Sequence, residues 1–215
     1  MDDQRWYRYL LLEPFEYQLR DGDDTFSWEA DGWVGGDDER LWLKTEGDLA
    51  EDEGEAEAQL LYSRLIAPFW DLQLGVRYDQ PWGSDADSSR AFAVVGLEGL
   101  APYYFDIEPA LFLSDDADVS ARLEATFDLL LAQRLVLQPR LELDAAVQEV
   151  PEHGVGQGLN DFELGARLRY ELRREFAPYV GVSWTRKTGE TAGIARRDGE
   201  EVSDFAVIFG VRMWF

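Results

Sequence analysis

The sequence predicts an all-β protein, a transmembrane antiparallel up-and-down β-barrel of about twelve strands. Three observations lead to this fold class. Apolar and polar residues alternate along most of the chain, short and long connections alternate between these segments, and aromatic residues gather at the segment ends. We find no convincing amphipathic helix. No apolar run approaches the roughly 18 to 20 residues that a membrane-spanning helix requires.

The clearest alternation lies in residues 135–147, 162–173 and 205–215. In the last of these, aromatic and aliphatic residues occupy one parity, and a glycine, an arginine and a tryptophan occupy the other. A period of two is typical of a strand with one apolar and one polar face. Weaker versions of the pattern cover residues 7–20, 25–34, 39–49, 55–65, 69–79, 90–100, 103–113, 119–131 and 176–186. An even count near twelve, with segments of about ten residues, fits a bacterial outer-membrane barrel.

The connections alternate in length. Short turns are expected near residues 66–69, 100–103, 131–134 and 173–176. Longer polar connections are expected near residues 80–89, 114–118, 150–161 and 187–203. Consecutive antiparallel strands place these two sets at opposite rims, with both termini at the rim of the short turns. Outer-membrane barrels have this layout, with short periplasmic turns and longer external loops.

Alternation alone does not decide whether the apolar face contacts lipid or packs inside a soluble barrel. The polar face uses arginine almost to the exclusion of lysine, because the chain holds only Lys44 and Lys187. Arginine is preferred in confined ion-pair networks, whereas a surface in water uses both basic residues. We therefore predict a polar interior, an apolar face toward lipid, and a monomer in the bacterial outer membrane that contacts outer-membrane lipid and lipopolysaccharide.

Aromatic residues at the strand ends favour the same interpretation, because amphipathic rings accumulate where a barrel meets lipid headgroups. The rings expected there are Trp6, Tyr7, Tyr9, Phe69, Trp70, Tyr103, Tyr104, Phe176, Tyr179, Trp214 and Phe215. The terminal phenylalanine also matches the end expected of barrels delivered to the outer-membrane assembly machinery.

Composition narrows the range of partners. The formal net charge is −24, from 44 acidic and 20 basic residues, which excludes a nucleic-acid-binding protein and favours a cation as the diffusible partner. The chain has no cysteine, so neither a disulfide framework nor a thiolate metal site can form. Its first residues lack the basic start and apolar stretch of a signal peptide. We expect residues 1–215 to form a single barrel domain, with the export signal removed.

Several long segments of the sequence are distinctive. They are RLWLKTEGDL, LLYSRLIAPFWDLQLGVRYD, GLEGLAPYYFDIEPALFLS, LLLAQRLVLQPRLEL, ELGARLRYELRREFAPYVGVSW, TGETAGIARRDGEE and GVRMWF. These segments closely resemble the copper resistance protein B family of outer-membrane proteins, and the similarity covers nearly the whole chain. The resemblance implies a barrel that acts in copper tolerance, binds or passes copper ion, and works alongside periplasmic copper-handling proteins.

One feature departs from that family. Its members commonly carry a segment rich in methionine and histidine ahead of the barrel, and here the first predicted strand begins almost at once, so we expect that leader to be absent. The chain has two methionines and one histidine. Soft thioether and thiolate ligands select Cu(I), and this chain cannot assemble such a site alone. We expect any copper that it holds to be Cu(II), on carboxylates with at most one imidazole.

Two groups of side chains are candidate metal ligands. His153 lies in a Gly-rich loop with Glu149 and Glu152 nearby, and a carboxylate with an imidazole suits several divalent ions. A solvated loop histidine is the alternative. The second group consists of carboxylates expected in the interior, where a low-dielectric wall strengthens their field for a cation. These are Asp106, Glu108, Glu124, Asp128, Glu142, Asp144, Glu163 and Glu171.

The interior carboxylates have a structural alternative. They could form a ladder with arginines of the same parity, which would plug the barrel. The arginines concerned are Arg122, Arg140, Arg167 and Arg169. An unpaired charge in a dry interior costs several kcal/mol, so each charge must pair or meet water there.

Catalysis has little support in the sequence. A hydrolase would need a nucleophile, a histidine base and an orienting acid that converge in space, and His153 is the single candidate base. We predict a non-enzymatic barrel that takes part in copper resistance, with a narrow acidic lumen lined by arginine and glutamate. The alternatives are a general diffusion pore for small cations and a lipid-modifying enzyme built around His153.

Overall fold

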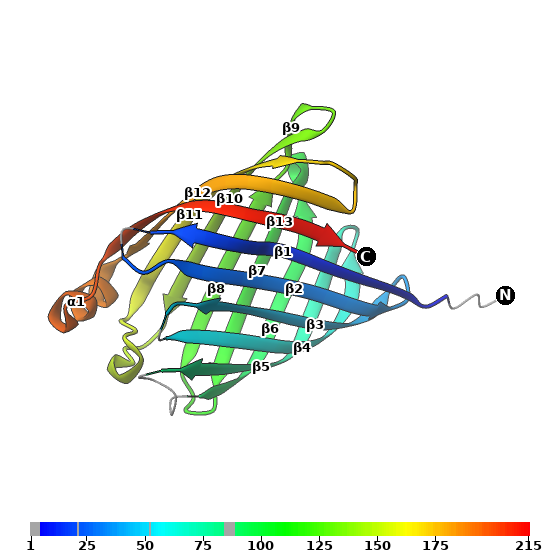
Figure 1. Cartoon of the computed structure of the whole chain (residues 1–215). Coiled ribbons are helices and arrows are strands. Elements are labelled where there is room, and N and C mark those ends of the chain that lie inside the picture. The colour runs from blue at the N-terminus through cyan, green and yellow to red at the C-terminus, as the bar shows by residue number, and fades with distance from the viewer. Residues whose placement is uncertain (1–4, 21, 52, 84–88) are drawn as a thin grey trace.

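In the computed structural model, which describes residues 5–20, 22–51, 53–83 and 89–215, the chain forms a closed antiparallel β-barrel (Figure 1). Neighbouring strands along the chain pair with each other, except at one interrupted strand described below, and β1 (Tyr7–Leu19) closes the wall against β13 (Ser203–Trp214). The predicted up-and-down topology is therefore confirmed. Closure gives the first and last strands backbone partners, as a lipid environment demands.

Thirteen segments make up the sheet. Between the closing strands lie β2 (Thr25–Gly35), β3 (Glu39–Leu49), β4 (Gly54–Ala67), β5 (Trp70–Trp82), β6 (Arg90–Ala101), β7 (Phe105–Ser114), β8 (Val119–Phe127), β9 (Leu129–Ala132), β10 (Leu135–Ala146), β11 (Gly158–Tyr170) and β12 (Phe176–Lys187). The segments β8 and β9 correspond to one predicted strand that is interrupted at Asp128. Counted this way, the barrel has twelve strands, as predicted.

The two rims differ as expected. The turns that follow β2, β4, β6, β9 and β11 lie at one rim, called here the short-turn rim, together with the start of β1 and the end of β13 (Figure 1). The remaining connections lie at the opposite, long-loop rim. Residues 84–88 of the predicted 80–89 connection lie outside the described residues.

The last long loop differs from the expectation that the chain has no amphipathic helix. That loop contains α1 (Gly189–Asp198), and short 3-10 turns occur at η1 (Pro102–Tyr104) and η2 (Pro151–His153). Ile194 of α1 is buried, and the backbone N–H of Gly156 donates a 2.9 Å hydrogen bond to Thr191 Oγ1, which ties α1 to the preceding long loop. Gly199 ends the helix with a φ of 84°, a conformation that favours glycine. No helix among the described residues is long and apolar enough to cross a membrane.

The outward face carries the apolar parity. Phe205, Val207 and Phe209 of β13 all lie exposed on the outer surface, where they would contact lipid. Most predicted rim aromatics are exposed as well, including Phe69 and Tyr103. The prediction that Tyr179 lies among the rim aromatics is wrong. Its side chain is only 5% exposed, and its hydroxyl donates a hydrogen bond to the carboxylate of Glu16 inside the barrel.

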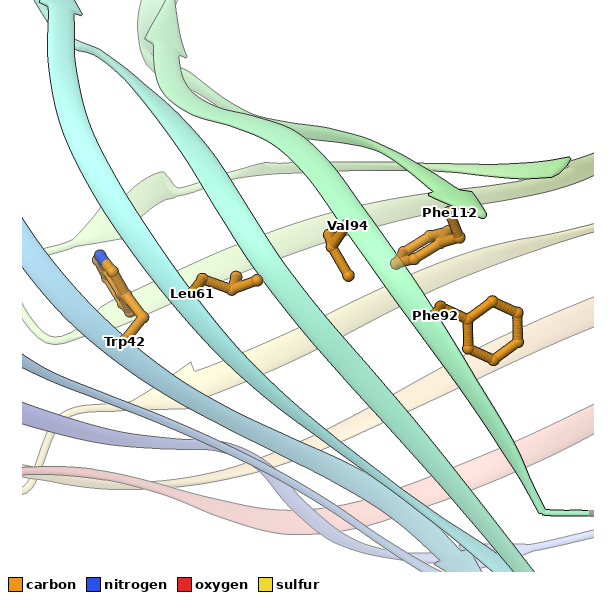
Figure 2. Close-up of a cluster of buried hydrophobic side chains, with 5 residues drawn as sticks. All are labelled: Trp42, Leu61, Phe92, Val94 and Phe112. Atoms are coloured by element: carbon orange, nitrogen blue, oxygen red, sulfur yellow. The ribbon is translucent and has the colours of Figure 1, made fainter. Parts of the chain in front are cut away.

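The interior is not polar throughout. A buried apolar cluster lies inside the wall formed by β3, β4, β6 and β7 (Figure 2). Its members are Trp42, Leu61, Phe92, Val94 and Phe112. The guanidinium of Arg77 lies 5.2 Å from the ring centre of Phe92 and 4.7 Å from that of Phe112. This cation–π contact joins the apolar cluster to the charged side chains nearby and fills part of the lumen.

The outward direction of the apolar rows can be tested with Leu164, an exposed residue in the middle of β11. We expect Leu164→Arg to lower the free energy of unfolding in lipid vesicles by about 2–4 kcal/mol, because an arginine would face the hydrocarbon midplane. Denaturant titration followed by tryptophan fluorescence measures this. Leu49→Arg, at the rim end of β3, is the matched control and should cost at most about 1 kcal/mol. Equal effects at both positions would contradict the assignment.

Candidate cation site in the barrel interior

Strand alternation brings the charged side chains into the barrel. In β10, Arg140, Glu142 and Asp144 share one parity, and the leucines between them share the other. Neighbouring strands are in register, so that Glu142 lies beside Glu124 of β8 on one side and Glu163 of β11 on the other. The pairing therefore stacks carboxylates in rows across the inner wall, and arginines must separate them.

Arg122 of β8 is the centre of the largest ion-pair network. Its guanidinium pairs with Glu46 of β3, lies 3.4 Å from a carboxylate oxygen of Glu57 on β4, and lies 3.3 Å from one of Asp144 on β10. Several strands separate β8 from β3 and β4 in both directions around the barrel. The contacts to Glu46 and Glu57 therefore cross the lumen.

Arg140 makes a second brace across the lumen. Its guanidinium lies 3.1 Å from Glu29 of β2 and 2.8 Å from Glu124 of β8. It also contacts Glu142 at 3.3 Å, and Glu142 lies 3.6 Å from Arg122. The two arginines thus belong to one network that links opposite walls.

A separate network is centred on Glu16 of β1, which is only 1% exposed. Its carboxylate accepts two hydrogen bonds from Arg167, at 3.0 and 2.9 Å, and one from the Tyr179 hydroxyl at 2.9 Å. Arg169, which lies on β11 like Arg167, pairs with Glu13 at 2.9 Å and with Asp128 at 2.6 Å. All four arginines predicted to form an interior ladder are therefore paired with carboxylates.

A small cavity of about 40 Å³ remains among these pairs. Such a volume holds about three water molecules, or an ion that has kept part of its hydration. Its charged lining residues are Glu29, Asp31, Lys44, Glu46, Glu57, Glu108 and Glu124. Six carboxylates thus face one ammonium group, although Arg122 and Arg140 also contact some of these carboxylates from outside the cavity.

Asp31 of β2 is the least satisfied carboxylate in this cavity. Its Oδ1 is buried and has no hydrogen-bond partner. Lys44, the nearest strand neighbour with a positive charge, instead bonds to Glu108 and lies 3.8 Å from Glu98. A buried carboxylate oxygen without a partner is costly, and a small cation is its natural complement.

Of the predicted interior ligands, Glu108 and Glu124 line the cavity that holds Asp31. Glu142 and Glu163 line a second, more open cavity of about 190 Å³, and Asp144 is held by Arg122. Asp106 is exposed at the start of β7, and Glu171 lies in the turn after β11. The structure thus distributes these residues along the interior instead of gathering them at one point.

His153 and Glu152 lie in η2 at the long-loop rim, away from the interior carboxylates. Within the part of the chain that the structure describes, no three histidine, aspartate or glutamate side chains form a group that could hold a metal ion. The early-strand members of the cavity were not among the predicted ligands; these are Glu29, Asp31, Glu46 and Glu57. Their inward parity in residues 25–34, 39–49 and 55–65 was the signal that could have identified them.

The energetic role of the buried pairs can be tested at Glu16. We expect Glu16→Gln to lower the free energy of unfolding by about 3–5 kcal/mol, because Arg167 keeps a buried charge without its counterion. Combining Glu16→Gln with Arg167→Met should restore much of that loss, and denaturant titration in vesicles measures both.

Lys187→Met provides the control for this cycle, since the pair between Lys187 and Glu200 is exposed and should contribute at most about 1 kcal/mol. Additive losses from Glu16→Gln and Arg167→Met would contradict the coupling.

The sequence of the chain matches a known protein family. A family model described as Copper resistance protein B precursor (CopB) matches residues 6–215. Copper resistance protein B from Escherichia coli is 45% identical over 208 residues, which cover 96% of this chain and 69% of that protein. A Copper resistance protein B homolog from Pseudomonas syringae pv. tomato is 39% identical over the same length and with the same coverage.

Solved structures share the barrel at low sequence identity. The NanC porin has a TM-score of 0.62 at 12% identity, with 95% of this chain and 98% of that chain covered. Outer membrane phospholipase A from Escherichia coli has a TM-score of 0.54 at 15% identity, with 98% of both chains covered. These similarities show the fold alone, an outer-membrane type of β-barrel. From the match across residues 6–215 and the identity to two relatives, the chain belongs to the copper resistance protein B family.

Proposed function

We propose that this protein lies in the outer membrane and takes part in copper resistance by letting Cu(II), as its cargo, bind to and move along the carboxylates of the barrel interior. The observation that carries the proposal is the buried, unpartnered oxygen of Asp31 in a cavity that five further carboxylates line. Family membership supports copper as the cation. Carboxylate ligands are compatible with Cu(II) and unsuited to Cu(I).

The carboxylates would act as a series of weak sites. Because no three of the described histidine, aspartate or glutamate side chains form a metal-holding group, each step would use one or two oxygens and retained water. Passage requires binding that is favourable enough for entry and weak enough for exit. The two cavities share Glu29, Glu46 and Glu57 in their linings, which supports a continuous route between them.

The braces of Arg122 and Arg140 would restrict this route. Both arginines hold carboxylates of opposite walls, and a divalent cation competes for the same oxygens. An entering cation would replace a guanidinium at Glu57 or Glu124, which lets the arginine move aside. These crossings favour a restricted cation route over a general diffusion pore, in which the lumen would be free of such pairs.

The proposed role is not enzymatic. The relatives are named for copper resistance, and the likeness to the phospholipase concerns the fold. Among the described residues, no hydrogen bond joins the ring of His153 to a serine, threonine or acidic side chain that could complete a hydrolytic site. In the proposed orientation the short-turn rim faces the periplasm, as in other outer-membrane barrels.

Replacing Asp31 tests the site. We expect Asp31→Asn to weaken Cu(II) binding by at least about tenfold, because the substitution removes the charge that lacks an internal counterion. Calorimetric titration and metal analysis of the same detergent-purified sample measure this. Asp204→Asn is the matched control, since Asp204 pairs with Arg20 at 3.3 Å, and should leave binding unchanged. Equal Cu(II) binding by Asp31→Asn and the unsubstituted protein would refute the assignment.

Replacing Arg122 and Arg140 tests whether these two arginines restrict the passage of cations through the barrel. We expect the Arg122→Ala, Arg140→Ala double variant to conduct cations several-fold better than the unsubstituted protein in planar bilayers, because the guanidinium contacts from β8 and β10 to Glu29, Glu46 and Glu57 on the opposite wall are then lost. Arg90→Ala, which removes a pair with Asp118, is the control and should leave conductance unchanged. A large conductance in the unsubstituted protein, unaffected by the double variant, would instead support the general diffusion pore.

A further inference from the structure

The segment β9 has an unpaired edge. It pairs with β10 through Ala132, Leu130 and Leu129, and it is the last segment in the order of the sheet. The pairing of β7 with β8 ends at Phe105 and Phe127, before β9 begins. The hairpin of β9 and β10 therefore extends beyond the rest of the wall at the short-turn rim (Figure 1). An edge of this kind presents backbone N–H and C=O groups that can pair with another strand.

Both faces of this hairpin expose leucine. Leu129, Leu130 and Leu131 are 43%, 68% and 53% exposed. Leu172, in the neighbouring turn, is exposed as well. The backbone N–H of Glu171 donates a 2.8 Å hydrogen bond to the carbonyl oxygen of Arg134, so this turn and the hairpin lie side by side. The exposed leucines of β9 and Leu172 thus lie at the same rim, on the two sides of β10.

Lipid tails do not suit this surface. Each backbone group without a hydrogen bond costs several kcal/mol in hydrocarbon, so the unpaired edge of β9 must lie outside the hydrocarbon layer. Water would satisfy the backbone groups and leave three leucines exposed. An extended polypeptide satisfies both requirements, because its backbone pairs with the edge while alternate side chains cover the leucines.

The charges around the edge indicate the composition of such a polypeptide. Arg134, Arg173 and Arg174 are all exposed at this rim. None of them takes part in an ion pair with the described residues, whereas the interior arginines are paired. Glu171 and Glu175 lie in the same turn, so this rim is marked by three guanidinium groups without ion-pair partners and not by a large net positive charge. A segment that carries carboxylates can pair with these guanidinium groups.

We propose that the β9 patch, formed by Leu129–Ala132, Arg134, Leu172, Arg173 and Arg174, docks an extended segment of a partner protein that carries both apolar and acidic residues. In the orientation proposed above, that partner is periplasmic. The segment adds to β9 as an antiparallel or parallel strand, and its carboxylates meet the three arginines. The short edge limits the contact to a small interface, typical of transient complexes.

A synthetic peptide of ten residues that alternates valine and glutamate serves as the probe. The unsubstituted barrel is placed in nanodiscs of phosphatidylethanolamine and phosphatidylglycerol without copper, and binding is followed by fluorescence anisotropy. We expect saturable binding that weakens by at least about tenfold in the Arg134→Glu, Arg173→Glu double variant and in Leu130→Ser. The Arg196→Glu, Arg197→Glu variant changes α1 at the opposite rim and should bind as the unsubstituted barrel does.

Three outcomes would overturn the proposal. The first is equal binding of a valine–lysine peptide, which would remove the role of charge. The second is equal binding of a peptide with proline at alternate positions, which cannot pair as a strand. The third concerns hydrogen exchange at residues 129–132 of the unsubstituted barrel. Slowing by phosphatidylglycerol alone, with no further slowing by the valine–glutamate peptide, would assign the patch to lipid headgroups.

The exchange experiment does not depend on how the variants fold, because it uses the unsubstituted barrel. Heat-modifiable mobility in gel electrophoresis checks that each variant is a closed barrel. Since no copper is present, failure of peptide binding leaves the proposed copper function untouched, and failure of copper binding leaves the β9 patch untouched.

Discussion

Charges that point into a barrel wrapped in lipid must find their counterions inside it. This requirement explains why the inner wall uses arginine, whose planar group can contact several carboxylates at once. Arg122 and Arg140 join strands that lie on opposite walls, and Arg167 holds Glu16 with two hydrogen bonds. The positions of the interior side chains follow from these pairs, since each arginine fixes the carboxylates that it contacts.

The same pairing explains where a cation can enter. Carboxylates outnumber positive groups around the smaller cavity, and Lys44 is already engaged by Glu108. Asp31 consequently forms no ion pair with a described side chain, and its Oδ1 has no hydrogen-bond partner. The apolar cluster around Phe92 and Phe112 occupies another part of the interior, so polar space is confined to the cavities between the arginines. Twelve strands would make the barrel wide enough for a pore, but these side chains narrow its interior.

Much of the wall could be predicted from sequence because a membrane strand must alternate, and residues 162–173 do so without interruption. Contacts across the lumen could not be predicted from the sequence. Arg140 and Glu29 are 111 positions apart, and only closure of the barrel brings them together. In β1, a register shift between Leu12 and Phe15 changes the parity, which concealed Glu16. The helix α1 was missed because its buried residues, apart from Ile194, are the small Thr191, Ala192 and Ala195, which give a weak apolar signal. The interruption at Asp128 was missed because it leaves the alternation of residues 119–131 intact.

The most direct test of this account is anomalous diffraction at the copper absorption edge from crystals of the protein grown with Cu(II). We expect an anomalous peak inside the barrel, beside Asp31 and between β2 and β7. A peak confined to the loop of His153, with no copper in the interior, would contradict it.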